Sequence, residues 1–221
     1  MVCHPRTDEP QTMRVAALAC ALVAAVPPGN AQSDPLADRA KGSPTAPVTV
    51  YEMSDFQCPY CRDFALNPMP TLEREYVATG RVRFVFVNLP LSRLHANAVA
   101  AAAAAMCAAH QRKFWPLHDL LFRHQDRWAG LKDPAPYFAA LSDSAGLNRA
   151  KLARCVTSPA TQSEIRADSV RAAKAGASST PTFYIEGGLL EGAAPVEVFR
   201  TVLDSIHRAK TAARPPPPPA P

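Results

Sequence analysis

Two cysteines, Cys58 and Cys61, enclose Pro59 and Tyr60 directly after residues that are typical of a buried strand. Residues 47–53 (PVTVYEM) are mostly β-branched or aromatic and contain few residues that break a strand. Proline is tolerated in the first turn of a helix, because the N–H that it lacks has no partner there. The spacing therefore predicts a buried strand followed by a helix that begins at Cys58-Pro59.

A cysteine in the first turn of a helix is suited to thiol–disulfide chemistry. The helix N-terminus carries partial positive charge and unpaired N–H groups, which favour a thiolate at Cys58. We therefore expect Cys58 to be the solvent-exposed nucleophile and Cys61 to be the buried resolving thiol. The Cys58 thiolate would attack a disulfide to give a mixed disulfide, which Cys61 resolves. Zinc binding, the alternative for this spacing, usually needs four ligands. Because Cys107 and Cys155 are far apart and no histidine lies at ligand spacing from Cys58, we predict no metal.

The remaining elements follow the order strand–helix–strand, a helical block, then strand–strand–helix. Residues 81–87 predict a second strand, and residues 182–185 predict a third that turns into an edge strand. The helix after the cysteines should kink around Pro68 and Pro70 and end at Gly80. Further helices are expected at 98–105, 114–124, 136–144, 149–156 and 161–175, and from Pro195 onwards.

Neither end of the chain has a globular composition. An apolar run at 15–26 follows Arg14 and ends in small residues before Gln32, which predicts a cleaved signal peptide and hence export. The expected organisation is a signal peptide at 1–31, a loose lead-in at 32–46, the first part of an α/β domain at 47–93, a helical insertion at 94–176, the second part at 177–210 and a disordered Pro-rich tail at 211–221.

Charge and cysteine content narrow the class of function. The net charge of +5 is spread along the chain, which gives no basis for nucleic-acid binding. Loss of the leader would leave four of the six cysteines, and an even number in an exported chain is typical of disulfide chemistry.

The segment 48–61 (VTVYEMSDFQCPYC) resembles the active-site segment of the DsbA-like bacterial disulfide oxidoreductases, in the branch with a C-P-Y-C motif. The similarity covers roughly residues 45–208. It continues through Asn88-Leu89-Pro90-Leu91, His95, Met106-Cys107-Ala108, Phe114-Trp115, His118, Leu121-Phe122 and Ser179-Thr180-Pro181-Thr182-Phe183-Tyr184-Ile185. The resemblance implies an enzyme, a protein disulfide oxidoreductase, that needs no cofactor. It also implies a thioredoxin-like α/β fold with a helical domain inserted between the two halves of the sheet.

The resemblance also assigns roles near the cysteines. The Thr180–Pro181 bond would be cis and lie against the pair, so that Thr180 and Pro181, with Pro59 and Tyr60, form a groove for an extended substrate. Glu52 would be a buried acid beneath Cys61 that relays its proton. The alternative for Glu52 is a strand-end carboxylate that reaches solvent.

Four positions in the helical insertion can also be interpreted. His118 shares a helical stretch with apolar residues, which favours a structural role. His95 lies near a predicted helix start, from which it could touch the rim of the active site, and we expect no catalytic role for it. Cys107 and Cys155 are expected to form a structural disulfide that staples the insertion. Two buried free thiols are the alternative, which an oxidising compartment disfavours.

The expected function is disulfide exchange with reduced or misfolded exported proteins in the periplasm or another extracytoplasmic compartment. A membrane thiol oxidoreductase would recycle the protein. The roughly fifteen residues at 32–46 are too few for a dimerisation domain, so we expect a monomer that acts as a dithiol oxidase. Three alternatives stay open: a periplasmic reductase or isomerase, a glutaredoxin-like reductase, and a chaperone-like binding module without turnover.

Overall fold

The computed structural model describes residue 34 and residues 36–212. The predicted signal peptide and the end of the Pro-rich tail lie outside this range. Strand β2 is parallel to β3, with Val48 beside Val82, while β1 runs antiparallel to β3 and β4 antiparallel to β2. The sheet has the order β1-β3-β2-β4-β5, with bounds Ala40–Lys41, Val48–Ser54, Val82–Asn88, Thr182–Ile185 and Gly188–Glu191 for β1 to β5.

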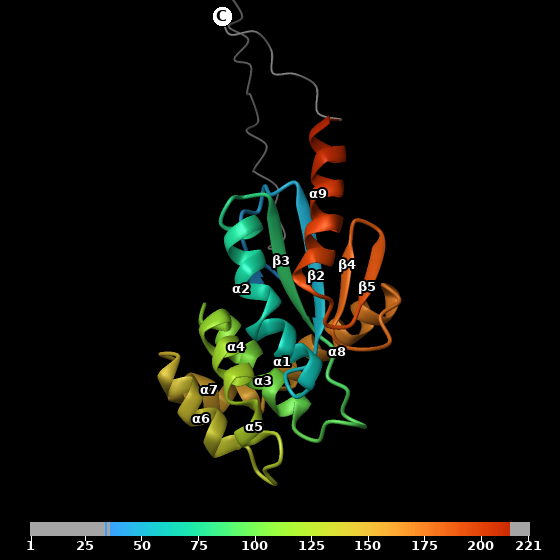
Figure 1. Ribbon diagram of the computed structural model, residues 1–221. Helices are drawn as coiled ribbons and strands as arrows, with labels where there is room; N and C mark the ends of the chain where they lie inside the picture. The colour runs from blue at the N-terminus through green and yellow to red at the C-terminus, as the bar shows by residue number, and fades with distance from the viewer. Residues whose placement is uncertain (1–33, 35, 213–221) are drawn as a thin grey trace, which may run out of the picture. The chain divides into compact units, whose positions relative to one another are not determined.

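Helices cover both faces of the sheet (Figure 1). Helices α1 (Pro59–Leu66), α2 (Pro68–Leu72) and α9 (Val196–Ala212) bury the face that carries residues such as Val50. The opposite face packs against α8 (Pro159–Lys174) through a smaller apolar cluster. Although the sequence analysis placed 161–175 in the helical insertion, α8 therefore forms a layer on the sheet.

The expected kink after the cysteines is a break between two helices. Helix α1 ends at Leu66, and α2 begins at Pro68 and continues into a π-helical turn, Glu73–Val77. Pro68 and Pro70 cannot donate backbone hydrogen bonds to the preceding turn, so one continuous ladder cannot form.

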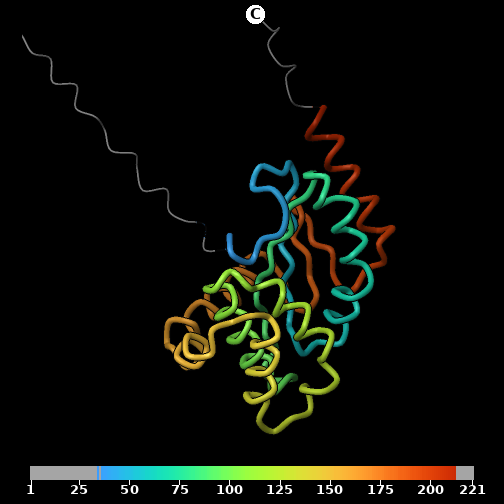
Figure 2. Tube along the Cα trace, turned by 90° about the vertical axis from the view of Figure 1, so that its left-hand side faces the viewer, coloured from blue at the N-terminus to red at the C-terminus, as the bar shows by residue number. Residues whose placement is uncertain are grey.

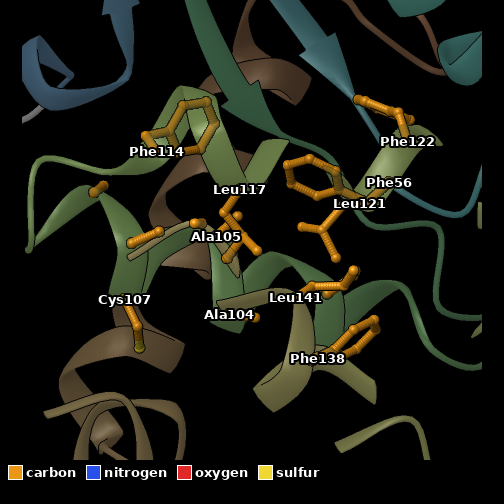
Figure 3. Packing of buried hydrophobic residues seen from close by; sticks show 14 of the residues in the cluster. Phe56, Ala104, Ala105, Cys107, Phe114, Leu117, Leu121, Phe122, Phe138 and Leu141 are labelled. Atoms are coloured by element: carbon orange, nitrogen blue, oxygen red, sulfur yellow. The ribbon is translucent and has the colours of Figure 1, made fainter. Parts of the chain in front are cut away.

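The helical insertion gathers beyond the end of the sheet where β2 and β3 finish (Figures 1 and 2). Phe56, from the loop after β2, packs among apolar side chains of this block, including Leu121 and Phe122 (Figure 3). The active-site loop is therefore part of the core of the insertion. The helices are α3 (Ala98–Ala109), α4 (Phe114–Arg123), α5 (Gln125–Trp128), α6 (Ala135–Ser144) and α7 (Arg149–Val156).

A disulfide joins the first and last of these helices. It links Cys107 of α3 to Cys155 of α7, with 5.7 Å between their Cα atoms. Cys107 is fully buried, whereas Cys155 is half-buried.

The segment expected to be a loose lead-in is partly ordered into the fold, which corrects that expectation for residues 37–41. A short 3-10 turn (Ala37–Arg39) precedes β1. The Arg39 side chain is 2% exposed and forms an ion pair with Asp168 of α8, which is fully buried. Asp168 also accepts hydrogen bonds from the backbone and side chain of Asn88, at 3.1 and 2.9 Å. This network ties the segment to β3 and α8.

The structure also contains α5, which the sequence analysis did not predict as a separate helix. Four residues are too few to show a helical period. Within the described range, the helices are all too short or too polar to cross a membrane.

Candidate active site

The cysteine pair lies where β2 passes into α1, as its spacing predicted. Cys58 is the N-cap of α1, with extended backbone angles, and Pro59 occupies the first helical turn. The backbone N–H of Cys58 donates to the carbonyl of Asp55 at 3.0 Å, and its carbonyl accepts from the N–H of Arg62 at 3.1 Å. Both cysteines are free thiols in the structure, which therefore describes the reduced form.

The prediction that Cys58 is exposed to solvent is wrong. The residue is 4% exposed, against 0% for Cys61. Its thiol lies 3.4 Å from the carbonyl oxygen of Thr180, so the loop before β4 covers part of it. Cys58 is the more accessible of the two cysteines, but a partner has to fit closely to reach it.

The two thiols differ in how readily they ionise. The pKa of Cys58 is lowered to about 6, chiefly by a hydrogen bond from the Cys61 thiol and also by the backbone N–H groups of Cys61 and Tyr60, against the effect of burial. Burial, together with the adjacent Cys58, raises the pKa of Cys61 well above the usual value. At neutral pH the pair therefore holds a thiolate at Cys58 and a neutral thiol at Cys61.

The residues expected to form the substrate groove lie together beside Cys58. The Thr180–Pro181 peptide bond is cis, and both residues are buried. Pro59 and Tyr60 are exposed at the start of α1, Tyr60 with 67% of its surface. The site thus combines the covered thiol of Cys58, the buried loop at Thr180–Pro181 and the exposed aromatic ring of Tyr60.

Glu52 is buried in the sheet, so the alternative of a carboxylate that reaches solvent is excluded. It is 2% exposed and pairs laterally with Phe86 on β3 and Phe183 on β4. Burial raises the pKa of its carboxyl to about 7, against smaller lowering effects of Ser54 and of the charge on Lys41. Such a carboxyl can hold or release a proton at neutral pH.

This raised pKa predicts a pH-dependent stabilisation in the variant Glu52→Gln. From pH 4.5 to 7 the folded protein keeps a proton that the unfolded chain releases, so wild-type stability falls as pH rises through this window. A shift of this size corresponds to about 3 kcal/mol. Urea unfolding of the reduced proteins should show the variant gaining about 3 kcal/mol relative to wild type between pH 4 and pH 8. A difference that stays constant with pH would contradict the buried ionisable carboxyl.

The two histidines occupy different surroundings. His95 lies beside the active-site turn, and its Nδ1 is 2.7 Å from a carboxylate oxygen of the buried Asp55. His118 lies among aromatic rings that include Phe56 and Phe86, and burial lowers its pKa. The structure therefore places His95 next to the cysteine loop and His118 in the core of the helical insertion.

Sequence reasoning missed three amide side chains near Cys58: Gln57, Asn97 and Gln125. They hydrogen-bond to backbone groups of the active-site loop and of the segment around α5. An amide at such a position belongs to no motif, so no pattern in the sequence could have identified them. Within 34 and 36–212, no three His, Cys, Asp or Glu side chains are grouped in a way that could hold a metal ion.

Comparison with known proteins places this arrangement in a class. A family model described as thioredoxin matches residues 35–205. The Na(+)/H(+) antiporter NhaA 3 of Salinispora tropica is 33% identical over 172 residues, which are 78% of this chain and 25% of that protein. Disulfide bond formation protein D of Bacillus subtilis is 24% identical over 170 residues, 76% of this chain and 77% of that protein. Crystalline alpha-DsbA1 of Wolbachia pipientis has a TM-score of 0.70 at 21% identity, over 79% of this chain and 92% of its own.

The fold and the cysteine pair define a thioredoxin-fold protein with a redox-type site. The chain belongs to the thioredoxin family. It is similar to a relative named for disulfide bond formation, and its fold is that of a DsbA protein. The expected thioredoxin-like fold is thereby confirmed. The chain spans about a quarter of the length of the first antiporter-named relatives, so that name describes proteins of which only a part resembles this chain.

Proposed function

We propose that this protein is an extracytoplasmic dithiol oxidase that donates the Cys58–Cys61 disulfide to reduced client proteins. The observation that carries the proposal is the unequal ionisation of the pair, with a thiolate at Cys58 and a neutral thiol at Cys61. This asymmetry makes Cys61 the sulfur that needs a proton and Cys58 the sulfur that can leave without one.

The reaction begins with a client thiolate that attacks Cys58 Sγ of the oxidised protein. The Cys58–Cys61 bond breaks, its electron pair goes to Cys61 Sγ, and that sulfur takes up a proton. Glu52, with a pKa of about 7, is a suitable proton donor. A second client thiolate then attacks the client sulfur of the mixed disulfide and expels Cys58 as a thiolate. The client gains a disulfide, and the protein is left as the dithiol that the structure shows.

The ionisation of Cys58 also bears on the direction of exchange. A thiolate that forms with a pKa of about 6 stabilises the reduced protein at pH 7, relative to an ordinary thiol. The gain is on the order of 1 kcal/mol, or a few tens of millivolts. This stabilisation of the reduced form favours the uptake of electrons from client thiols. Because the stabilisation is small, we expect a redox potential below that of the strongest oxidants.

The predicted partners follow from this role. Clients are reduced or misfolded exported proteins, and a membrane thiol oxidoreductase would return Cys58 and Cys61 to the disulfide after each transfer. The disulfide bond formation name of a relative supports this assignment. We expect a monomer, and the Cys107–Cys155 disulfide serves as a structural staple. The reductase and isomerase readings, and that of a binding module without turnover, remain as outcomes of the test below.

The test is stoichiometric transfer to a reduced, unfolded client that needs disulfides for activity. The oxidised protein should restore client activity as its own pair becomes reduced, and Thr180 and Pro181 should lie in the surface that binds the client. If the protein instead reduces insulin disulfides without oxidising thiols, it is a reductase. Client binding without any change in the redox state of Cys58 and Cys61 would show a binding module.

A further inference from the structure

We propose that Gln125, from the helical insertion, is a positioning residue for the nucleophilic thiol of Cys58. The inference rests on the proposed function and deepens it, because it names a side chain outside the cysteine motif that holds the reacting sulfur in place.

The side-chain amide of Gln125 donates two hydrogen bonds to the active-site loop. Gln125 Nε2 donates to the carbonyl of Phe56 at 2.7 Å and to the carbonyl of Cys58 at 2.9 Å. Gln125 is 6% exposed, and it is the first residue of α5. An amide NH₂ has two donors, so both are used on the loop that carries the nucleophile. The bonds join residues 69 and 67 positions apart in the chain.

Neighbouring amides fix Gln125 relative to that loop. Gln57 Nε2 donates to the carbonyl of Ala129 at 2.9 Å, and Gln57 Oε1 accepts from the backbone N–H of Asn97 at 2.7 Å. The Asn97 side chain donates in turn to the carbonyls of Trp128, Ala129 and Leu131. Helix α5 and the active-site loop are therefore joined by a set of backbone-directed hydrogen bonds.

The ring of Trp128 anchors the other end of α5. It is fully buried, and its Nε1 donates to the carbonyl of Leu121 at 2.8 Å. A four-residue helix has little stability of its own, so these contacts must set where Gln125 lies. Helix α5 therefore connects the core of the insertion, through Trp128, to the Cys58 loop, through Gln125.

The position of the Cys58 backbone matters because the hydrogen bonds that stabilise the thiolate form only when the sulfur points toward their donors. The sulfur is stabilised by the Cys61 thiol and by backbone N–H groups at the start of α1. Without the Gln125 amide, the Phe56 carbonyl loses this donor and the Cys58 carbonyl keeps only the N–H of Arg62, so the loop can move and the sulfur spends less time in that position. The thiol should then ionise at higher pH, while the chemistry of the pair stays otherwise the same.

The test is the pH profile of Cys58 alkylation by iodoacetamide in the reduced variant Gln125→Met, with the label assigned by peptide mapping. If the midpoint moves from about 6 to about 7, the rate at pH 6 relative to pH 8 falls about fivefold. This ratio does not depend on how intrinsic reactivity changes with pKa. Gln125→Asn, whose amide is one methylene shorter, should shift the profile the same way by less, and it carries the test if the methionine variant fails to fold.

The matched control is Gln111→Met, which makes the same chemical change elsewhere in the insertion. Gln111 accepts a hydrogen bond from the N–H of Asn148 at 2.8 Å and joins the end of α3 to the start of α7. It should leave the alkylation profile unchanged even if it lowers stability. A Gln125 variant whose profile superimposes on that of wild type would overturn the proposal. Because alkylation requires no client, this outcome is distinguishable from failure of the disulfide transfer assay.

Discussion

Replacing Cys58 with serine should lower the rate of disulfide transfer to a reduced client by at least about 1,000-fold. A serine hydroxyl neither forms a disulfide nor ionises at neutral pH. Cys61 cannot take over, because it is fully buried and its pKa is raised well above the usual value. The measurement is the stoichiometric transfer assay proposed above, in which the wild-type protein provides the reference rate.

Cys61→Ser is the matched control for this prediction. It keeps the reactive thiolate of Cys58 but removes the sulfur that resolves mixed disulfides. Mixed with clients that already carry a disulfide, it should accumulate covalent complexes, because Cys58 Sγ attacks the client disulfide and expels one client sulfur as a thiolate. The serine variant at Cys58 should form none. Transfer by Cys58→Ser within tenfold of the wild-type rate would contradict the assignment of the nucleophile.

Removing the Cys107–Cys155 disulfide should destabilise the protein by about 4 kcal/mol in the chain-entropy account of cross-links. The two cysteines are 48 positions apart, and the bridge joins α3 to α7 across the helical insertion. The double variant Cys107→Ala and Cys155→Ala removes the link without leaving a free thiol. Urea unfolding of both proteins with the Cys58–Cys61 pair reduced measures the loss.

The same disulfide should persist when mild thiol reduces Cys58 and Cys61. Its accessible sulfur belongs to the half-buried Cys155, and attack there would expel Cys107 as a thiolate in a fully buried position. Burying a thiolate is costly, so exchange at this bond is disfavoured. Alkylation of Cys107 without denaturant, in protein from the exported fraction, would contradict a structural staple.

The strands and the long helices could be predicted because their patterns are local. The alternation in 81–87 and the apolar run in 47–53 identify β3 and β2 within a residue at each end. The Cys58–Cys61 spacing also placed the start of α1 correctly. Each of these signals comes from neighbouring residues that share one environment.

The missed features depend on residues that are distant in sequence. Arg39 is buried because Asp168 of α8 neutralises it, and neither residue signals the other along the chain. Gln125 reaches Cys58 across nearly seventy positions. The covered position of Cys58 likewise arises from the Thr180 loop, which folds over it from the second half of the sheet.

The redox potential of the Cys58–Cys61 pair, measured in glutathione buffers at pH 7, tests the role of disulfide donor most directly. The lowered pKa of Cys58 favours the reduced form of the pair and therefore disulfide donation. We expect a potential clearly above that of thioredoxin, about −270 mV, and below that of the most oxidising DsbA, about −120 mV. A value at or below about −270 mV would identify a reductase and contradict the proposed function.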